Sequence, residues 1–360
     1  MPQPTRVALL SAALLASTLA AQADSISVTD QTGRTVELDQ PAERAVVIPI
    51  PSTSTVIALD GGTDRLVGMH PLAKSAIEEA ILGEFFPGAR DIPSDIIAGN
   101  SGFAPNVEAI AALDPDLVVQ WGSQGDDIVA PLTNAGLETA LILYGDEEKA
   151  RAIITLLGTL IGKPEKVDAI IGWRDETAAK IEAGLKDLPD AERPSVLYLL
   201  RAETELRVAG TGTYNDYYIN LAGGRNAAAE IDGLKPVNAE QIAAWNPDVI
   251  LLNGFESELD VSRIYDDPVL GATNAAVDRR VYKMPIGGYR WDPPSQESPL
   301  TWQWLADLLH PDRVDFDIRG QIVEWYRTLY GQTPTPDQID AILRLDMNGD
   351  GANYDRFAAE

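Results

Sequence analysis

A short internal repeat constrains the fold of this 360-residue sequence more than any other feature. Residues 106–119 read NVEAIAALDPDLVV and residues 238–251 read NAEQIAAWNPDVIL, so the two copies align without a gap, 132 residues apart from Glu108 to Glu240. Each copy predicts an Asn-capped short helix, a Pro-Asp turn and a buried strand. A capped helix that feeds a strand is a generic α/β device, but its recurrence in both halves indicates two related lobes.

Short apolar runs alternate with helical patterns, which is typical of βαβ units and parallel sheets. We expect buried strands at residues 45–49, 117–121, 140–144, 195–200, 248–252 and 280–284. Between the two groups of strands, residues 147–188 carry apolar side chains at helical spacing. Pro164 interrupts this stretch because it cannot donate to a helical hydrogen-bond ladder. One or two helices should therefore join the lobes.

The first 23 residues have the layout of a secretory signal peptide. Arg6 is the only charge before the apolar run 7–20, and Ala21-Gln22-Ala23 offers the small residues of a cleavage site. The run is too short to span a bilayer, and no cysteine follows it to carry a lipid anchor. We therefore expect an exported, periplasmic protein without a membrane anchor. The predicted domains are an N-terminal lobe (24–146), a linking helix region (147–188), a C-terminal lobe (189–345) and an acidic tail (346–360).

Composition excludes several classes of function. Lys and Arg number 28 against 55 Asp and Glu, and the net charge of −27 argues against nucleic acid and anionic membrane surfaces as partners. The chain has no cysteine and two histidines, too few for thiolate or three-His metal sites. No Gly-x-Ser-x-Gly, His-Glu-x-x-His or P-loop motif is present, so we expect no catalysis. A secreted hydrolase with paired carboxylates stays open as the alternative of another class.

Three further segments complete a resemblance to a known family. They are VTDQTGR at 28–34, LAGGRN at 221–226 and DPPSQESPL at 292–300. With the repeat, the export signal and the linking helix, the chain resembles periplasmic substrate-binding proteins of ABC importers for iron–siderophore complexes, haem and cobalamin. The resemblance implies an α/β fold of two Rossmann-like lobes with central, mostly parallel sheets, joined by a long rigid helix, with the ligand cleft between the lobes. It also implies that Glu108 and Glu240, one in each lobe, dock onto arginines of the membrane permease.

Ligands of open α/β sheets bind beyond the carboxyl ends of the strands. Those ends carry aromatic, hydroxyl and guanidinium side chains, which suit a bulky anionic metal chelate. A ferric siderophore is the first expectation; a molybdate-type oxyanion, haem and cobalamin stay open. We expect a monomer whose only cofactor is the transported chelate. The candidate ligand-binding residues are Ser52, His70, Trp121, Arg201, Tyr214, Tyr289, Arg290 and Trp291.

A final signal lies near the C-terminus. Asp346, Asn348 and Asp350, followed by Gly351, match the first half of a calcium loop, with oxygen ligands at positions 1, 3 and 5. The twelfth position is Phe357 instead of a bidentate Glu. The segment therefore indicates either a weak calcium site or an Asp/Asn/Gly-rich tail.

Overall fold

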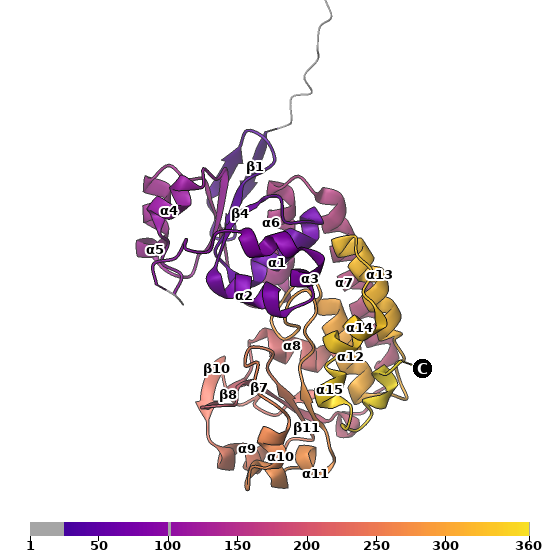
Figure 1. Cartoon of the computed structure of the whole chain (residues 1–360). Coiled ribbons are helices and arrows are strands. Elements are labelled where there is room, and N and C mark those ends of the chain that lie inside the picture. The colour runs from indigo at the N-terminus through magenta and orange to yellow at the C-terminus, as the bar shows by residue number, and fades with distance from the viewer. Residues whose placement is uncertain (1–24, 100–101, 360) are drawn as a thin grey trace, which may run out of the picture.

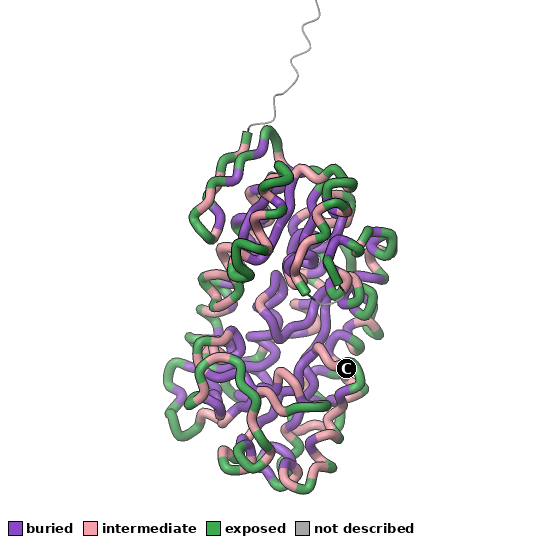
Figure 2. The backbone as a smooth tube through the Cα atoms, turned by 90° about the vertical axis from the view of Figure 1, so that its left-hand side faces the viewer, coloured by how far each residue is buried: buried purple, intermediate pink, exposed green. Residues whose placement is uncertain are grey.

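The computed structural model describes residues 25–99 and 102–359, and the predicted signal peptide at 1–23 lies outside them. The chain forms two α/β lobes with helices along one side (Figure 1). The burial pattern in Figure 2 places buried backbone inside each lobe and also where the lobes meet. No helix in the described part of the chain is long and apolar enough to cross a membrane.

The N-terminal lobe contains a four-stranded sheet whose strands all run parallel, in the order β4-β3-β5-β6. The three strands predicted here are confirmed, whereas β4 was not predicted. A hairpin of β1 (Ile26–Thr29) and β2 (Thr35–Leu38) precedes the sheet. The strands are β3 (Ala45–Val47), β4 (Leu66–Met69), β5 (Leu117–Trp121) and β6 (Thr139–Ile142). The helices are α1 (Ile50–Asp60), α2 (Pro71–Glu79), α3 (Leu82–Phe85), α4 (Val107–Ala112) and α5 (Asp126–Asn134).

The C-terminal lobe contains a mixed sheet in the order β10-β8-β7-β11-β12, with β9 also paired to β7. The three predicted strands β7, β11 and β12 are parallel, whereas β8 and β10 form an antiparallel arm that the sequence did not indicate. The strands are β7 (Ser195–Arg201), β8 (Leu206–Ala209), β9 (Arg225–Asn226), β10 (Leu234–Val237), β11 (Val249–Leu252) and β12 (Val281–Lys283). The helices are α8 (Tyr214–Leu221), α9 (Ala239–Trp245), α10 (Ser262–Tyr265) and α11 (Asn274–Val277).

The repeat forms the same unit twice. Asn106 caps α4 by accepting the amide of Ala109 at 3.2 Å, and Asn238 caps α9 by accepting the amide of Gln241 at 2.8 Å. Each helix then leads through the Pro-Asp turn into a central strand, β5 or β11. The predicted capped helix, turn and strand are therefore confirmed in both lobes.

The turn residues of the repeat do more than change the chain direction. Asp114 and Asn246, which precede the prolines, have φ of 48° and 46°, the left-handed conformation that ends a helix. The following Asp116 and Asp248 accept backbone amides at the start of the neighbouring strands, from Arg44 at 3.0 Å and from Ser195 at 2.8 Å. One short motif thus stops a helix and fixes the alignment of two parallel strands.

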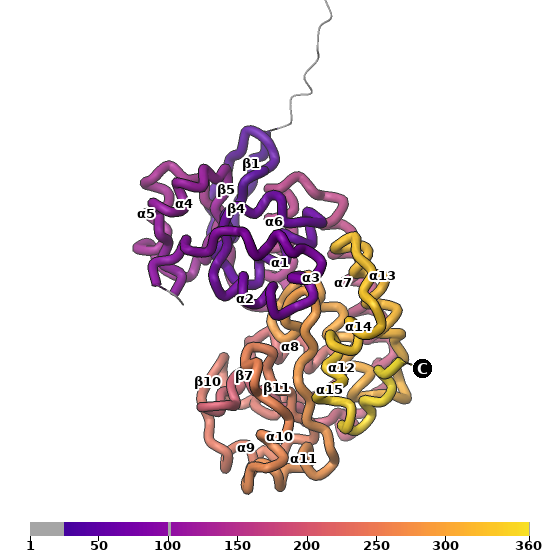
Figure 3. The backbone as a smooth tube through the Cα atoms, in the orientation of Figure 1, coloured from indigo at the N-terminus to yellow at the C-terminus, as the bar shows by residue number. Residues whose placement is uncertain are grey.

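The linking region consists of two helices, α6 (Glu147–Leu160) and α7 (Pro164–Gly184). With 21 residues, α7 is roughly 30 Å long and packs against α6, α8 and α12. The last helices run beside it, as Figure 3 shows for the yellow end of the chain. Trp173 of α7 stacks on Trp325 of α13 at 3.9 Å, and α13 also touches α1. These helices are α12 (Ser298–Leu309), α13 (Ile318–Tyr330), α14 (Pro336–Ile342) and α15 (Leu345–Asn348).

The structure corrects the expectation of an acidic tail at 346–360. Tyr354 is fully buried, stacks on Tyr282 and donates to the carbonyl of Leu343 at 2.5 Å. Asn348 accepts the amide of Lys283 at 2.8 Å and donates to its carbonyl at 2.9 Å, so its side chain pairs with the edge strand β12. The segment therefore completes the core of the C-terminal lobe.

The same geometry corrects the expectation of a calcium loop. The Asn348 amide is buried and engaged with β12, whereas Asp346 and Asp350 are exposed. Among residues 25–99 and 102–359 no group of three or more His, Cys, Asp or Glu side chains is placed to hold a metal ion. The segment forms the short helix α15, where the sequence pattern indicated an open calcium-binding loop.

The caps of the repeat can be tested by substitution. Asn238→Ala should lower the free energy of unfolding by about 1 kcal/mol, because an amide in the first turn of α9 loses its acceptor. Urea unfolding measures the change. Asn238→Ser keeps a capping oxygen and serves as the control; equal stability of the Ala and Ser variants would contradict the capping role.

Candidate ligand cleft between the lobes

One wall of the cleft is a row of aromatic rings on the N-terminal lobe, formed by Phe103, Trp121 and Tyr144. Neighbouring ring centroids are 6.3 Å apart with edge-to-face interplanar angles of 86° and 77°. Trp121 is the last residue of β5, and Tyr144 follows β6, so the row marks the carboxyl edge of the sheet. Tyr144 is 45 % exposed, which is unusual for a large ring at a strand end.

A small pocket lies beside this row, at the N-terminus of α1. It has a volume of about 20 Å³. Residues 50–60 form α1, and its first turn holds no acidic side chain but begins a run of hydroxyls from Ser52 to Thr55. A helix N-terminus carries partial positive charge, and the Ser52 hydroxyl lies at this end of the helix, so this end of the cleft suits an anion. The lining residues are Pro51, Ser52, Thr55, Trp121, Tyr144, Ala150, Ile153, Ile154, Pro294 and Ser295.

The opposite wall, on the C-terminal lobe, carries two arginines on either side of one aromatic ring. The guanidinium carbons of Arg201 and Arg290 each lie 5.3 Å from the ring centroid of Phe255, and we call these three residues the Arg–Phe–Arg group. Arg290 also lies over Tyr289 at 5.8 Å and donates to the Gly254 carbonyl at 2.7 Å. Cation–π contacts hold the guanidinium planes in place while leaving N–H groups for a ligand.

Contacts across the cleft bring the two walls close together. Arg290 forms an ion pair with Glu79, the last residue of α2, at 2.9 Å. The surroundings of Tyr144 raise the pKa of its hydroxyl, first through burial between the walls and then through Asp292 and Tyr289 of the other lobe. Gln296 accepts hydrogen bonds from Thr55 at 3.1 Å and from Ser54 at 3.4 Å, which closes the cleft floor.

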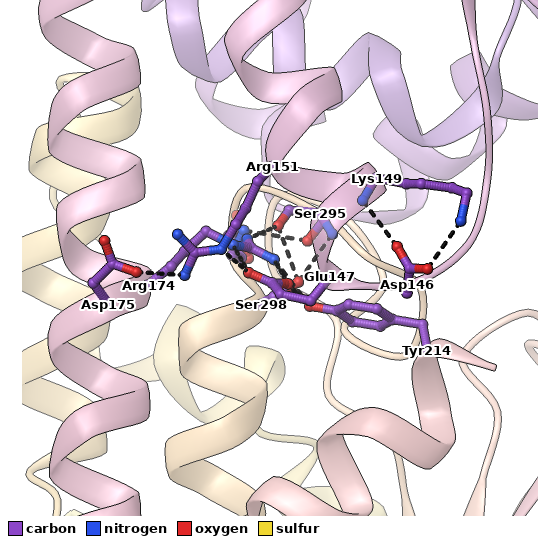
Figure 4. A network of polar contacts seen from close by, with 10 residues as sticks. Asp146, Glu147, Lys149, Arg151, Arg174, Asp175, Tyr214, Ser295 and Ser298 are labelled. Carbon is purple, nitrogen blue, oxygen red and sulfur yellow. Dashed lines mark hydrogen bonds and ion pairs between the residues drawn. The ribbon is translucent and has the colours of Figure 1, made fainter. Parts of the chain in front are cut away.

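A buried charge network joins the linking helices to the C-terminal lobe (Figure 4). Arg174 of α7 is fully buried and donates to Glu147 of α6 at 2.7 Å, to Tyr214 of α8 at 3.0 Å and to the Ser295 carbonyl at 2.8 Å. Burial alone would lower the pKa of Arg174, but Tyr214 and Glu147 raise it, so the guanidinium stays charged. Arg151 joins the outer side of Glu147 at 2.8 Å.

The structure brings five of the predicted ligand-binding residues to the two walls. Ser52 and Trp121 line the pocket, and Arg201, Tyr289 and Arg290 belong to or adjoin the Arg–Phe–Arg group. These residues share a position at or after the carboxyl end of a strand. Parallel strands place their carboxyl ends at the same edge of a sheet, and this brings the residues together.

The other three predicted ligand-binding residues lie elsewhere. Tyr214 takes part in the Arg174 network, and Trp291 is buried and donates to Glu297 at 2.9 Å. His70 caps α2: its Nδ1 accepts the Leu72 amide at 3.0 Å and its Nε2 donates to the Gly102 carbonyl at 3.0 Å. Burial lowers the pKa of His70, and both ring nitrogens are engaged within the protein.

Several cleft residues were not among the predicted ones. Tyr144 ends a predicted strand and Phe255 follows β11 by three residues. The strand-end rule indicated both positions, although neither is among the eight candidate ligand-binding residues. Glu79 ends a helix far from any strand end and becomes part of the cleft only through tertiary packing, so the sequence carried no signal for it.

The predicted docking residues Glu108 and Glu240 are exposed and occupy the same position in the first turns of α4 and α9. These helices lie on the side of the lobes away from α7, one on each lobe (Figure 1). Neither carboxylate takes part in an ion pair with another residue of the described chain. Their placement leaves both available to a partner.

Comparison with known proteins identifies the class of this two-lobed architecture. Residues 51–286 match the family described as periplasmic binding protein, and this chain belongs to that family. A crystal structure of a periplasmic solute binding protein from Veillonella parvula has 34 % sequence identity and a TM-score of 0.82, and the match covers 91 % of this chain and 99 % of that one. The chain is thus a substrate-binding protein of an ABC importer and not an enzyme.

Relatives with named ligands differ in what they bind. The molybdate-binding protein MolA of Haemophilus influenzae is 28 % identical over 91 % of this chain and 97 % of its own length. A cobalamin-binding protein of Halobacterium salinarum is 27 % identical over 61 % of this chain and 63 % of its own. A periplasmic haem-binding protein, BhuT, has 26 % identity and a TM-score of 0.58, over 74 % of this chain and 98 % of that one.

The role of the buried network can be measured directly. Arg174→Met should lower the free energy of unfolding by about 3 kcal/mol or more, because it leaves Glu147 without its buried partner. Arg151→Met is the matched control: Arg151 pairs with the same carboxylate from a partly exposed position, so its loss should cost less than about 1 kcal/mol. If urea unfolding gives both variants the same loss of free energy, burial of Arg174 does not increase its contribution to stability.

Proposed function

We propose that this protein is an exported receptor that binds a molybdate-type oxyanion between its lobes and delivers it to an ABC importer permease. The observation that carries the proposal is the hydroxyl-rich N-terminus of α1, which opens into a pocket closed by Trp121 and Tyr144. A helix N-terminus without acidic neighbours is a favourable place for a compact anion. The similarity to MolA, which spans nearly the whole of both chains, supports the same ligand class.

Size favours an oxyanion over the larger ligands. The pocket of about 20 Å³ has room for about one water molecule, so every candidate ligand requires it to widen. A compact tetrahedral ion requires less widening than haem or cobalamin, for which the lobes would have to separate widely. The Arg174 network and the helices beside α7 oppose such a separation, because they connect the lobes along their length.

A ferric siderophore is the second candidate, and a separate observation favours it. The aromatic row on one wall offers flat ring faces. The Arg–Phe–Arg group on the other wall offers two guanidinium groups and one ring. Catecholate or carboxylate oxygens around iron could accept from both arginines while aromatic parts stack on the rings. This candidate requires the cleft to open further than the oxyanion does.

Delivery would use the two exposed glutamates. Glu108 and Glu240 could each form a bidentate pair with a permease arginine, and two distant pairs would fix the orientation of the docked protein. The layout of residues 1–23 as an export signal agrees with a periplasmic location.

Isothermal titration of the purified mature chain tests the ligand. Sodium molybdate should bind with saturation, sodium sulfate more weakly, and zinc chloride not at all. Arg290→Ala should weaken molybdate binding at least tenfold, the scale of a charge-assisted hydrogen bond of about 1.5 kcal/mol. Arg207→Ala, a paired surface arginine, is the control. Binding of a ferric catecholate siderophore without molybdate binding would select the second candidate, and binding of cobalamin alone would overturn both.

Docking is tested separately from ligand binding. The double variant Glu108→Ala with Glu240→Ala should lose uptake in cells that depend on this importer, while its ligand affinity stays that of the wild type. The double variant Glu176→Ala with Glu258→Ala removes two exposed carboxylates from other surfaces and should transport normally. Normal uptake by the Glu108 and Glu240 variant would refute the docking role.

A further inference from the structure

The ion pair between Arg290 and Glu79 has an unusual position. Among the residues that the structure describes, it is the one ion pair that joins residues before Glu147 to the C-terminal lobe. The Arg290 side chain is 11 % exposed and that of Glu79 is 49 % exposed. The Glu79 carboxylate accepts from one N–H group of Arg290 at 2.9 Å, and it occupies a donor that an anionic ligand could otherwise use.

A second guanidinium lies behind Glu79. A cavity of about 110 Å³ between α2–α3 and α14–α15 is lined by both Glu79 and Arg344. The Nε atom of Arg344 is buried and has no hydrogen-bond acceptor within the described residues. Burial lowers the pKa of Arg344, and Asp346 opposes this effect. Arg290 lowers the pKa further and Glu79 raises it, so the charges of Glu79, Arg290 and Arg344 lie in one electrostatic neighbourhood.

The backbone at Arg344 indicates that this placement is specific. Its φ of 54° falls in the left-handed region, which a long side chain adopts at a cost. This conformation begins α15 and turns Arg344 into the wall of the cavity beside Glu79. The other carboxylate of the cavity, Glu84, already accepts from Gln338 at 2.6 Å.

We infer that Glu79 is a movable internal anion with two partners, Arg290 in the ligand-free protein and Arg344 in the complex. The inference rests on the proposed anionic ligand. The ligand takes the place of the Glu79 carboxylate on Arg290, and the displaced carboxylate turns into the cavity, where it accepts a hydrogen bond from the Nε–H of Arg344. In the complex each of these charges is then paired, because the carboxylate that leaves Arg290 gives Arg344 the hydrogen-bond acceptor that its Nε lacks in the ligand-free protein.

This exchange would set the selectivity of the site. A weak monoanion cannot displace a carboxylate that is held next to its arginine, whereas a dianion with several oxygens can. The Glu79 carboxylate also favours release of the ligand. It competes with the ligand for Arg290 when the two lobes move apart on the permease. Glu79 is thus a specificity-determining residue that lowers affinity in return for discrimination.

A double-mutant cycle tests the exchange by titration with sodium molybdate. Glu79→Gln should bind about tenfold more tightly than the wild type, because the competitor is gone. Arg344→Gln should bind about tenfold more weakly, because displaced Glu79 loses its second partner. The variant with both changes should match Glu79→Gln alone, since Arg344 acts only through Glu79. Glu84→Gln, in the same cavity, is the matched control and should leave affinity unchanged.

The outcomes separate the inference from the proposed function. If the wild type binds neither molybdate nor a ferric catecholate, the function and the inference fall together. If it binds one of them and Glu79→Gln is unchanged or weaker, the inference alone is overturned. An effect of Arg344→Gln that persists in the Glu79→Gln background also overturns it. Thermal melting of each variant confirms folding, and a structure of the complex should place the Glu79 carboxylate at hydrogen-bond distance from Arg344.

Discussion

The geometry of the cleft depends on one buried guanidinium. Arg174 has no contact with water, and a charge in that position is tolerated only when it is paired and fully hydrogen-bonded. Its partners come from α6, from α8 and from the loop before α12, so satisfying this single group fixes the linking helices against the C-terminal lobe. An apolar contact could have given similar stability, but it would not have fixed the lobes in one orientation.

Much of the fold could be predicted from the sequence, because local patterns decide it. The paired motifs with Asn106 and Asn238 contain a cap, a helix stop and a strand within fourteen residues, and each part follows from backbone chemistry. The antiparallel arm of β8 and β10 carries no comparable signal, since its pairing partners are chosen by tertiary packing. The segment around Asn348 was misread because Asp, Asn and Gly serve a calcium loop and a helical turn equally well.

The cleft was predicted in part for the same reason. Ser52, Trp121, Arg201, Tyr289 and Arg290 follow strand ends, and parallel sheets place those ends together. Tyr214 and His70 have suitable chemistry but serve the scaffold, one in the Arg174 network and one as a helix cap. The strongly acidic surface would repel an anion, so the arginines of the Arg–Phe–Arg group must reverse the field locally.

The packing of the last residues has a consequence for how the chain reaches its folded state. Tyr354 and Phe357 fill the core of the C-terminal lobe, and α13 touches α1 near the beginning of the chain. Contacts between segments so far apart in sequence form late, because a long loop must close before they give any stabilisation. The core of the C-terminal lobe is therefore complete only after the segment with Tyr354 and Phe357 has packed against it.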